Sequence, residues 1–140
     1  MLRYEKKAKR KGFKLIVGID EAGRGPLAGP VVAASVLIGK KLFKERIDDS
    51  KSLSPLKRRK AFFEILRHCL VSVGIVDNTD VDEINILNAT KRAMEQAVSG
   101  LGIKPDYLLI DGNIKLNLPF HQEGIIKGDS KSISIAAASI

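Results

Sequence analysis

Hydrophobic residues along the chain fall into short runs that are bounded by charge or glycine. Leu15–Ile19 and Pro30–Ile38 are rich in Ile, Val and Ala, a pattern typical of buried strands. Val71–Val76 and Asp106–Ile110 share this character, and Glu123–Lys127 is a shorter example. The pattern predicts a strand at each of these places, with the first two antiparallel across a glycine-rich turn.

Two longer segments carry hydrophobic residues at helical spacing. The first begins at Ser54, a favourable N-cap, followed by Pro55, which suits the first helical position. We expect one face of this helix to lie in the core. That face consists of Leu56, Phe62, Phe63, Leu66 and Leu70.

The second helix is predicted to begin at Asp80, with Glu83 completing a near capping box, and to end at Gly100 and Gly102. A third helix of small residues is predicted over Ile133–Ile140. The buried stripe of the second helix is expected to contain Ile84, Leu87, Met94, Ala97, Val98 and Leu101.

Strands that alternate with helices after an initial antiparallel pair predict an α/β fold with a mixed central β-sheet flanked by helices. The 140 residues, 44% of them hydrophobic, suit a single domain over 1–140. Residues 1–14, which precede the first strand, are rich in lysine and arginine. This basic lead-in is either a solvated tail or a contact for a polyanion.

The composition of the chain bears on where the protein is located in the cell. No apolar stretch approaches the roughly 20 residues of a membrane helix, and the N-terminus lacks the apolar core of a signal peptide. We therefore expect a cytoplasmic protein with no membrane contact. The single cysteine, Cys69, cannot form an internal disulfide, and its apolar neighbours predict a buried, unreactive thiol.

The formal net charge of +8 and the pI near 9.7 favour a polyanionic partner such as nucleic acid. Charge alone does not decide this, because many small cytoplasmic proteins are basic. Lys57–Lys60 lies in the first turns of a predicted helix, where the macrodipole disfavours cations unless an anion is nearby. A solvated helix face is the simpler interpretation of this run.

Acidic residues follow three of the predicted strands or loops: Asp20 with Glu21, Asp111, and Asp129. Any one of them alone could be an ordinary turn residue. A cluster of like charges is unfavourable unless cations offset the repulsion, and carboxylates are the ligands that Mg²⁺ prefers. Together they predict a metal site, and two such ions could activate water for phosphodiester cleavage without a protein nucleophile.

The turn after Asp20 and Glu21 contains Gly23, Arg24 and Gly25. Glycines let the backbone approach a ligand closely, and arginine offers a planar fork for phosphate. A solvated turn is the alternative for so short a motif.

Other site types fit less well. No G-x-x-x-x-G-K-[ST] motif occurs, and Gly23 with Gly25 makes a poor dinucleotide fingerprint because the third glycine is misplaced. His68 and His121 lack cysteine partners at zinc spacing. His68 is expected on a helix surface, and His121 is either a surface loop residue or a candidate for assisting at the metal site.

The sequence D-E-A-G-R-G-P-L-A-G-P-V-V-A-A over residues 20–34 resembles the signature of the type 2 ribonucleases H, the ribonuclease HII family. Further segments are similar to this family: D-S-K-S-L-S over 49–54, D-E-I-N-I-L-N-A-T over 82–90, I-D-G-N over 110–113 and K-G-D-S over 127–130. The resemblance runs from about Gly12 to the last residue.

The resemblance implies an RNase H-like fold. It also implies a two-metal site, in which Asp20, Glu21, Asp111 and Asp129 hold Mg²⁺ or Mn²⁺. The implied activity is an endonuclease that hydrolyses the RNA strand of RNA-DNA hybrids and cuts at ribonucleotides embedded in duplex DNA. The residues implied to contact substrate are Gly23, Arg24, Gly25, Ser50 and Lys51, with the glycine turn reading the ribose 2′-hydroxyl.

The resemblance also implies a longer domain. Family members continue after the match to Ile140 with a longer helix, a segment whose tyrosine stacks near the junction sugar, and a C-terminal helical region. We therefore expect a C-terminally incomplete domain, whereas the full-length family is expected to be monomeric. The alternative function is a catalytically silent or unstable hybrid-binding fragment of the same family.

Overall fold

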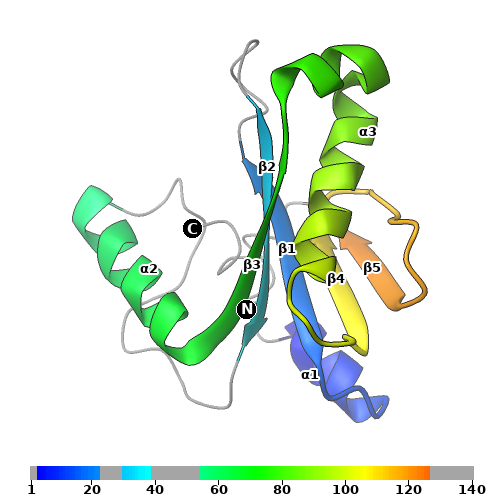
Figure 1. Ribbon diagram of the computed structural model, residues 1–140. Helices are drawn as coiled ribbons and strands as arrows, with labels where there is room; N and C mark the ends of the chain where they lie inside the picture. Colours follow the sequence, from blue (N-terminus) through cyan, green and yellow to red (C-terminus); the bar gives the residue numbers. More distant parts are fainter. Residues whose placement is uncertain (1–2, 23–29, 39–53, 127–140) are drawn as a thin grey trace.

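A five-stranded sheet forms the centre of the computed structural model, which describes residues 3–22, 30–38 and 54–126 (Figure 1). The order of the strands across the sheet is β3-β2-β1-β4-β5. The elements are α1 (Arg3–Arg10), β1 (Ile16–Ala22), β2 (Val31–Ile38), α2 (Pro55–His68), β3 (Cys69–Val76), α3 (Asn78–Ser99), β4 (Tyr107–Asp111) and β5 (His121–Ile125).

The sheet is mixed, as the sequence predicts. β1 pairs with β2 antiparallel, and β2 pairs with β3 antiparallel. β4 is parallel to both β1 and β5. Because β1 lies in the middle and runs the same way as β4, the carboxyl ends of β1, β4 and β5 share one edge of the sheet.

The main core lies between the sheet and α3. Val17, Ile19, Leu108 and Ile110 point from β1 and β4 toward this helix and are fully buried. Ser35 of β2 is also fully buried, and its hydroxyl donates to the carbonyl of Ala97 at 2.7 Å. This bond satisfies a polar group that would otherwise destabilise the core.

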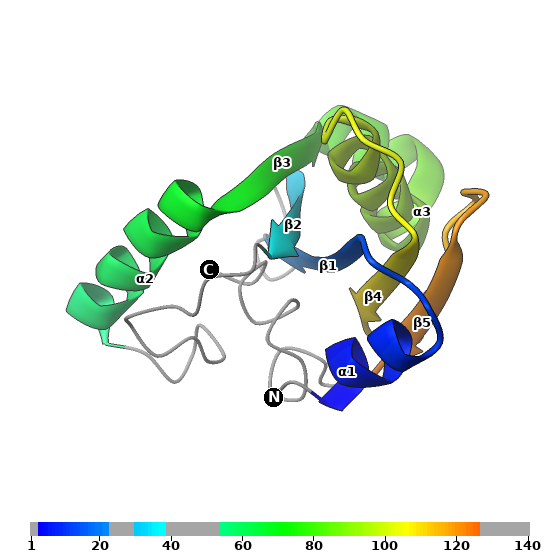
Figure 2. The ribbon, with the colours of Figure 1, turned by 90° about the horizontal axis from the view of Figure 1, so that it is seen from below.

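The opposite face of the sheet is covered in part by α1, as the view from below shows (Figure 2). Ala8 of α1 packs with Ile16, Leu109 and Ile125 in a second, smaller cluster. One carboxylate oxygen of Asp106 accepts from the backbone N–H groups of Lys14 and Leu15, each at 2.9 Å. This contact joins the segment after α1 to the start of β4.

The first long helix begins where it is predicted, but its orientation is not the predicted one. The Ser54 hydroxyl accepts from the backbone N–H of Lys57 at 3.2 Å, so Ser54 is the N-cap of α2. The expected core face is instead exposed: this applies to Leu56, Phe62, Phe63, Leu66 and Leu70. α2 runs directly into the edge strand β3 and stands beside the sheet rather than over it, so the sheet does not cover this face (Figure 1). Its buried apolar residues are Ala61 and Ile65.

The second long helix also differs at its start. α3 begins at Asn78 after Asp77, so Asp80 lies inside the helix and is not its cap. Asn85 interrupts the helix with a φ of 67°, and its side-chain oxygen accepts from the backbone N–H of Asn88 at 3.1 Å. With a ψ of 167° this backbone is strained for a residue other than glycine, and the Asn85 side chain caps the part of the helix that follows.

The restart changes which residues of α3 are buried. Leu87, predicted in the buried stripe, is 47% exposed. The prediction is confirmed further along, where the helix lies flat on the sheet. Met94, Ala97, Val98 and Leu101 are all buried there.

Smaller differences concern strand bounds. β1 continues through Asp20 and Glu21 to Ala22, and β5 begins at His121, two residues before the predicted start. Cys69 is half-buried rather than buried. The predicted helix over Ile133–Ile140 lies outside the described residues. In the described part of the chain, no helix has the length and apolar character needed to cross a membrane.

Candidate metal centre

Asp20 and Asp111 occupy equivalent positions on neighbouring parallel strands. Ile19 of β1 pairs with Ile110 of β4, so the next residue of each strand is a carboxylate. Because side chains alternate along a strand, Asp20 and Asp111 leave the sheet on the same face. Asp111 is the last residue of β4, which places both groups at the carboxyl edge.

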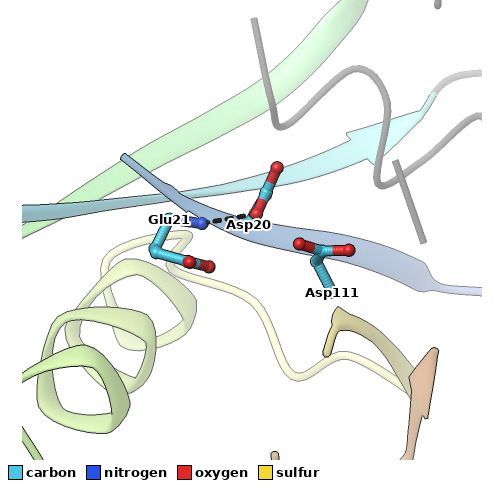
Figure 3. A group of neighbouring side chains, drawn as sticks. All are labelled: Asp20, Glu21 and Asp111. Carbon is cyan, nitrogen blue, oxygen red and sulfur yellow. Dashed lines mark hydrogen bonds between the residues drawn. The ribbon is translucent and has the colours of Figure 1, made fainter. Parts of the chain in front are cut away.

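Glu21 completes a cluster of carboxylates at this edge. It follows Asp20 and leaves β1 on the opposite side, as Figure 3 shows. Each of Asp20, Glu21 and Asp111 nevertheless offers a carboxylate oxygen that lies within 4.8 Å of the other two. Three carboxyl groups therefore converge on a small volume.

The electrostatics of the cluster centre on Asp20, whose residue surface is only 6% exposed. Burial, followed by the charges of Asp111 and Glu21, raises the pKa of Asp20 to about 9 from its ordinary value of 3.8. The backbone N–H of Glu21 donates to an Asp20 carboxylate oxygen at 2.8 Å and offsets part of this effect. The ionised cluster is thus unfavourable unless a cation lies beside it.

The donor chemistry fits a hard divalent cation. Carboxylate oxygens suit Mg²⁺ and Mn²⁺, and a cation among them would relieve the repulsion that raises the pKa of Asp20. No histidine or cysteine belongs to the cluster found among the described residues. Asp20, Glu21 and Asp111 are therefore the residues in this part of the chain that could hold such an ion.

The other predicted site residues cannot be placed. Asp129, which follows the end of β5 by four positions in the sequence, lies outside the described residues. The same holds for the predicted substrate contacts Gly23, Arg24, Gly25, Ser50 and Lys51.

His121 does not belong to the candidate site. It is the first residue of β5 and pairs with Tyr107, the first residue of β4, so it lies at the end of the parallel strands away from Asp111. Its ring instead lies 5.0 Å from that of Phe13, between ring centres. Its predicted alternative as a surface loop residue is also corrected, since it is an exposed strand residue.

Sequence reasoning missed the residues that support Asp111. Gly112 donates its backbone N–H to the carbonyl of Ile125 at 2.8 Å, and Gly124 lies against it in β5. An isolated glycine inside a strand pattern is the signal that could have revealed this close backbone approach.

The mixed sheet, the helices on both its faces and the carboxylates at the ends of β1 and β4 define an RNase H-like α/β protein with a candidate metal site. A family model, Ribonuclease HII, matches residues 17–140. The chain belongs to the ribonuclease HII family.

Curated relatives from this family align with the chain over nearly its whole length. A Ribonuclease HII from Acetivibrio thermocellus is 55% identical over 142 aligned residues, covering 100% of this chain and 55% of the relative. Another, from Caldicellulosiruptor bescii, is 53% identical and covers 97% of this chain and 66% of the relative. The chain thus spans between 55% and 66% of the length of these relatives.

Solved structures show the same fold. The ribonuclease H2 from Pyrococcus horikoshii superposes with a TM-score of 0.76 at 26% identity, covering 90% of this chain and 69% of that one. The RNase HII of Archaeoglobus fulgidus, solved in a complex with PCNA, gives a TM-score of 0.74 at 27% identity with the same coverage. Both likenesses support the RNase H-like fold predicted from the sequence.

Proposed function

We propose that this chain carries the catalytic carboxylates of a metal-dependent endonuclease, which hydrolyses the RNA strand of RNA-DNA hybrids and cuts at ribonucleotides embedded in duplex DNA. The observation that carries the proposal is the convergence of Asp20, Glu21 and Asp111 at the ends of β1 and β4 in a chain of the ribonuclease HII family. Because the chain spans only part of its relatives, the activity is a proposal for this chain.

Each carboxylate has a definable task in this reaction. Asp20 and Asp111, side by side on parallel strands, would hold a divalent ion together with Glu21. Asp129 would join them, as its place in the family motif implies. Mg²⁺ or Mn²⁺ bound there, as one ion or two, would activate water and stabilise the leaving oxygen of a phosphodiester.

The strand β1 matters because it must hold Asp20 in position when this carboxyl group loses its proton to a bound ion. The Glu21 N–H already donates to Asp20 and favours its ionised form. Hydrolysis would leave a 3′-hydroxyl and a 5′-phosphate. No side chain of the protein has to act as a nucleophile in this scheme.

Substrate contacts in this proposal come from the turn after β1 and from Ser50 and Lys51. The exposed cations of α1, among them Lys6, Lys9 and Arg10, would attract the phosphate backbone without reading its sequence. A cytoplasmic location, and a monomeric state of the full-length family, belong to the same proposal and derive from composition and from the resemblance.

Cleavage assays on four matched duplexes test the proposed activity: an RNA-DNA hybrid, DNA with one ribonucleotide, all-DNA and all-RNA. We expect Mn²⁺-dependent or Mg²⁺-dependent cutting of the first two, and none after a chelator is added. Cutting that persists in chelator would refute the metal assignment. Binding to the hybrid without any cutting would favour the silent hybrid-binding module instead.

Arg24→Ala is expected to weaken hybrid binding by roughly tenfold, because it removes a charged fork for phosphate. Gly25→Ala is expected to impair cutting at a single ribonucleotide more than it weakens binding to all-DNA, because a Cβ would occupy space that the 2′-hydroxyl needs. Paired binding and cleavage measurements on both duplexes check this. Equal losses on hybrid and all-DNA would mean that the turn is only a phosphate clamp.

Mn²⁺ is expected to raise the melting temperature, and the increase should be larger at pH 8 than at pH 5. The reason is that the ion must displace the proton that Asp20 retains when its pKa is about 9. Because one proton is displaced for each ion bound, the affinity for Mn²⁺ should fall by about tenfold for each pH unit below this pKa. A free Mn²⁺ concentration of about 100 times Kd would stabilise the folded protein by about 2.7 kcal/mol. Thermal scans with Mn²⁺ and with chelator at both pH values measure this difference. A shift that is independent of pH would contradict the prediction.

A further inference from the structure

We infer that Gly124 of β5 is a positioning residue for Asp111, because the absence of its side chain lets β5 fix the backbone directly after that carboxylate. This inference rests on the proposed function, since it assigns to Gly124 an effect on the affinity of the same metal site. Gly124 contributes no ligand atom itself. It would act through the backbone of Gly112.

The chain turns sharply after Asp111. Gly112 adopts a φ of 97°, a left-handed conformation that residues with a Cβ rarely adopt. Its backbone N–H donates to the carbonyl of Ile125 at 2.8 Å. Ile125 is the residue of β5 that pairs with Asp111. Ile125 therefore pairs with the last residue of β4 and also anchors the turn that follows it.

Gly124 lies directly under this turn. A Cβ at position 124 would stand 2.5 Å from the carbonyl oxygen of Gly112, 3.2 Å from the N of Ile114 and 3.4 Å from the Cα of Asn113. All three atoms belong to the backbone, so no side-chain rotation can relieve the overlap. An alanine here must push the segment after Asp111 away from β5.

The far end of that segment is held in place. The Gln122 side chain accepts from the Leu116 N–H at 2.6 Å and donates to the Leu116 carbonyl at 3.0 Å. A Glu95 carboxylate oxygen on α3 accepts from the Asn117 N–H at 2.8 Å. Since residues 116 and 117 are tied to both β5 and α3, a displacement at Gly112 is passed back to Asp111.

Metal binding is sensitive to such a displacement. The oxygens of Asp20, Glu21 and Asp111 already lie within 4.8 Å of one another, and Mg²⁺ accepts donors only within a narrow range of distances. Supporting residues around a metal site typically change affinity by about 10- to 100-fold. Moving one carboxylate away from the others therefore weakens the site without removing a ligand.

Gly124→Ala tests this, with Gly100→Ala as the matched control. The control adds the same methyl group at the C-terminus of α3, where it overlaps only the Ser72 hydroxyl, which can rotate away, and stands 3.3 Å from the Gln96 carbonyl oxygen. Titration with Mn²⁺, corrected for the folded fraction, should show about a tenfold loss of affinity in Gly124→Ala. The control should stay within about twofold of the original chain, although it too loses some stability.

A second measurement does not involve metal. Hydrogen exchange of the Gly112 amide reports the bond to Ile125 directly, and it should lose protection in Gly124→Ala but not in Gly100→Ala. Gly112→Ala is a second variant that disturbs the same turn without a steric overlap, because its Cβ would meet only the Ile114 side chain, at 3.8 and 3.9 Å. It should weaken Mn²⁺ binding in the same direction through its strained φ.

Normal Mn²⁺ affinity, or normal protection of the Gly112 amide, in Gly124→Ala would overturn the inference. A different result would overturn the proposed function: an original chain that binds no Mn²⁺, or an Asp20→Asn variant that binds it equally well. In that case the exchange of the Gly112 amide still decides whether Gly124 fixes the backbone after Asp111. Loss of protection would support that contact, and retention would refute it.

Discussion

Asp20→Asn is expected to abolish the proposed RNA cleavage and, in the same molecule, to stabilise the metal-free protein. The loss of activity should be at least about a thousandfold, because the amide replaces a charged oxygen that sits between Glu21 and Asp111. Asp111→Asn should have the same effect on cleavage. If both variants kept full activity, the assignment of the metal site would be wrong.

The gain in stability follows from the raised pKa of Asp20. An acid whose folded pKa lies at about 9 rather than 3.8 binds its proton more tightly in the folded state. The contribution of Asp20 to the free energy of unfolding is therefore fully present below pH 3.8. It is lost as the pH rises toward 9, by up to about 1.4 kcal/mol per pH unit. Asparagine has no ionisable group, so this loss does not occur in Asp20→Asn. We therefore expect the substitution to stabilise the metal-free protein by roughly 2 kcal/mol at pH 7.

Denaturant unfolding with a chelator, compared at pH 5 and pH 8, measures this effect. Asp106→Asn is the matched control at the opposite end of β4. Hydrogen bonds from the Leu15 and Lys14 backbone N–H groups lower the pKa of Asp106, so its charge stabilises the fold above its ordinary pKa and this is lost in acid. The control should therefore keep cleavage and lose stability, the reverse of Asp20→Asn.

The strands, and a cluster of acidic residues at their ends, could be predicted because apolar runs that end in a carboxylate are a local signal. Apolar runs that end in Asp20 and Asp111 mark two buried strands, and parallel strands bring their carboxyl ends to one edge. The distance between Asp20 and Asp111 depends in addition on β1 and β4 being neighbours in this register, which the hydrophobic pattern does not specify. The glycine that supports Asp111 was not recognised, because a close backbone approach depends on which strand lies alongside.

The helices show where sequence periodicity is insufficient. The stripe from Leu56 to Leu66 has the spacing of a buried face, yet periodicity does not say which element covers it, and in the described part of the chain these residues are exposed. α3 begins after Asp77 rather than at Asp80, because both aspartates have the residue type of an N-cap and the pattern does not distinguish them, and the break at Asn85 is not visible in the hydrophobic spacing. A side chain that caps a helix from within its sequence resembles any other polar residue in the pattern.

Gly74→Ala is expected to cause the largest loss of stability of any single methyl addition considered for this chain. Gly74 pairs with Ala33 in the sheet and lies where α3 crosses β3. A Cβ here would overlap the backbone carbonyl oxygen of Ala93 and stand 2.8 Å from the backbone N of Ala97. Because both atoms belong to the helix backbone, the only relief is to lift α3 away from the sheet.

Lifting α3 would loosen the main core, since Met94 and Val98 pack from this helix against β1 and β4. We expect a loss of about 3 kcal/mol or more, near the upper end for overpacking, and a fall in melting temperature of roughly 10 °C. Val73→Ala is the neighbouring control, because Val73 is 53% exposed on the other face of β3 and should cost less than about 1 kcal/mol. Equal melting temperatures for the two variants would mean that α3 does not cross β3 as closely as the contact between Gly74 and Ala93 requires.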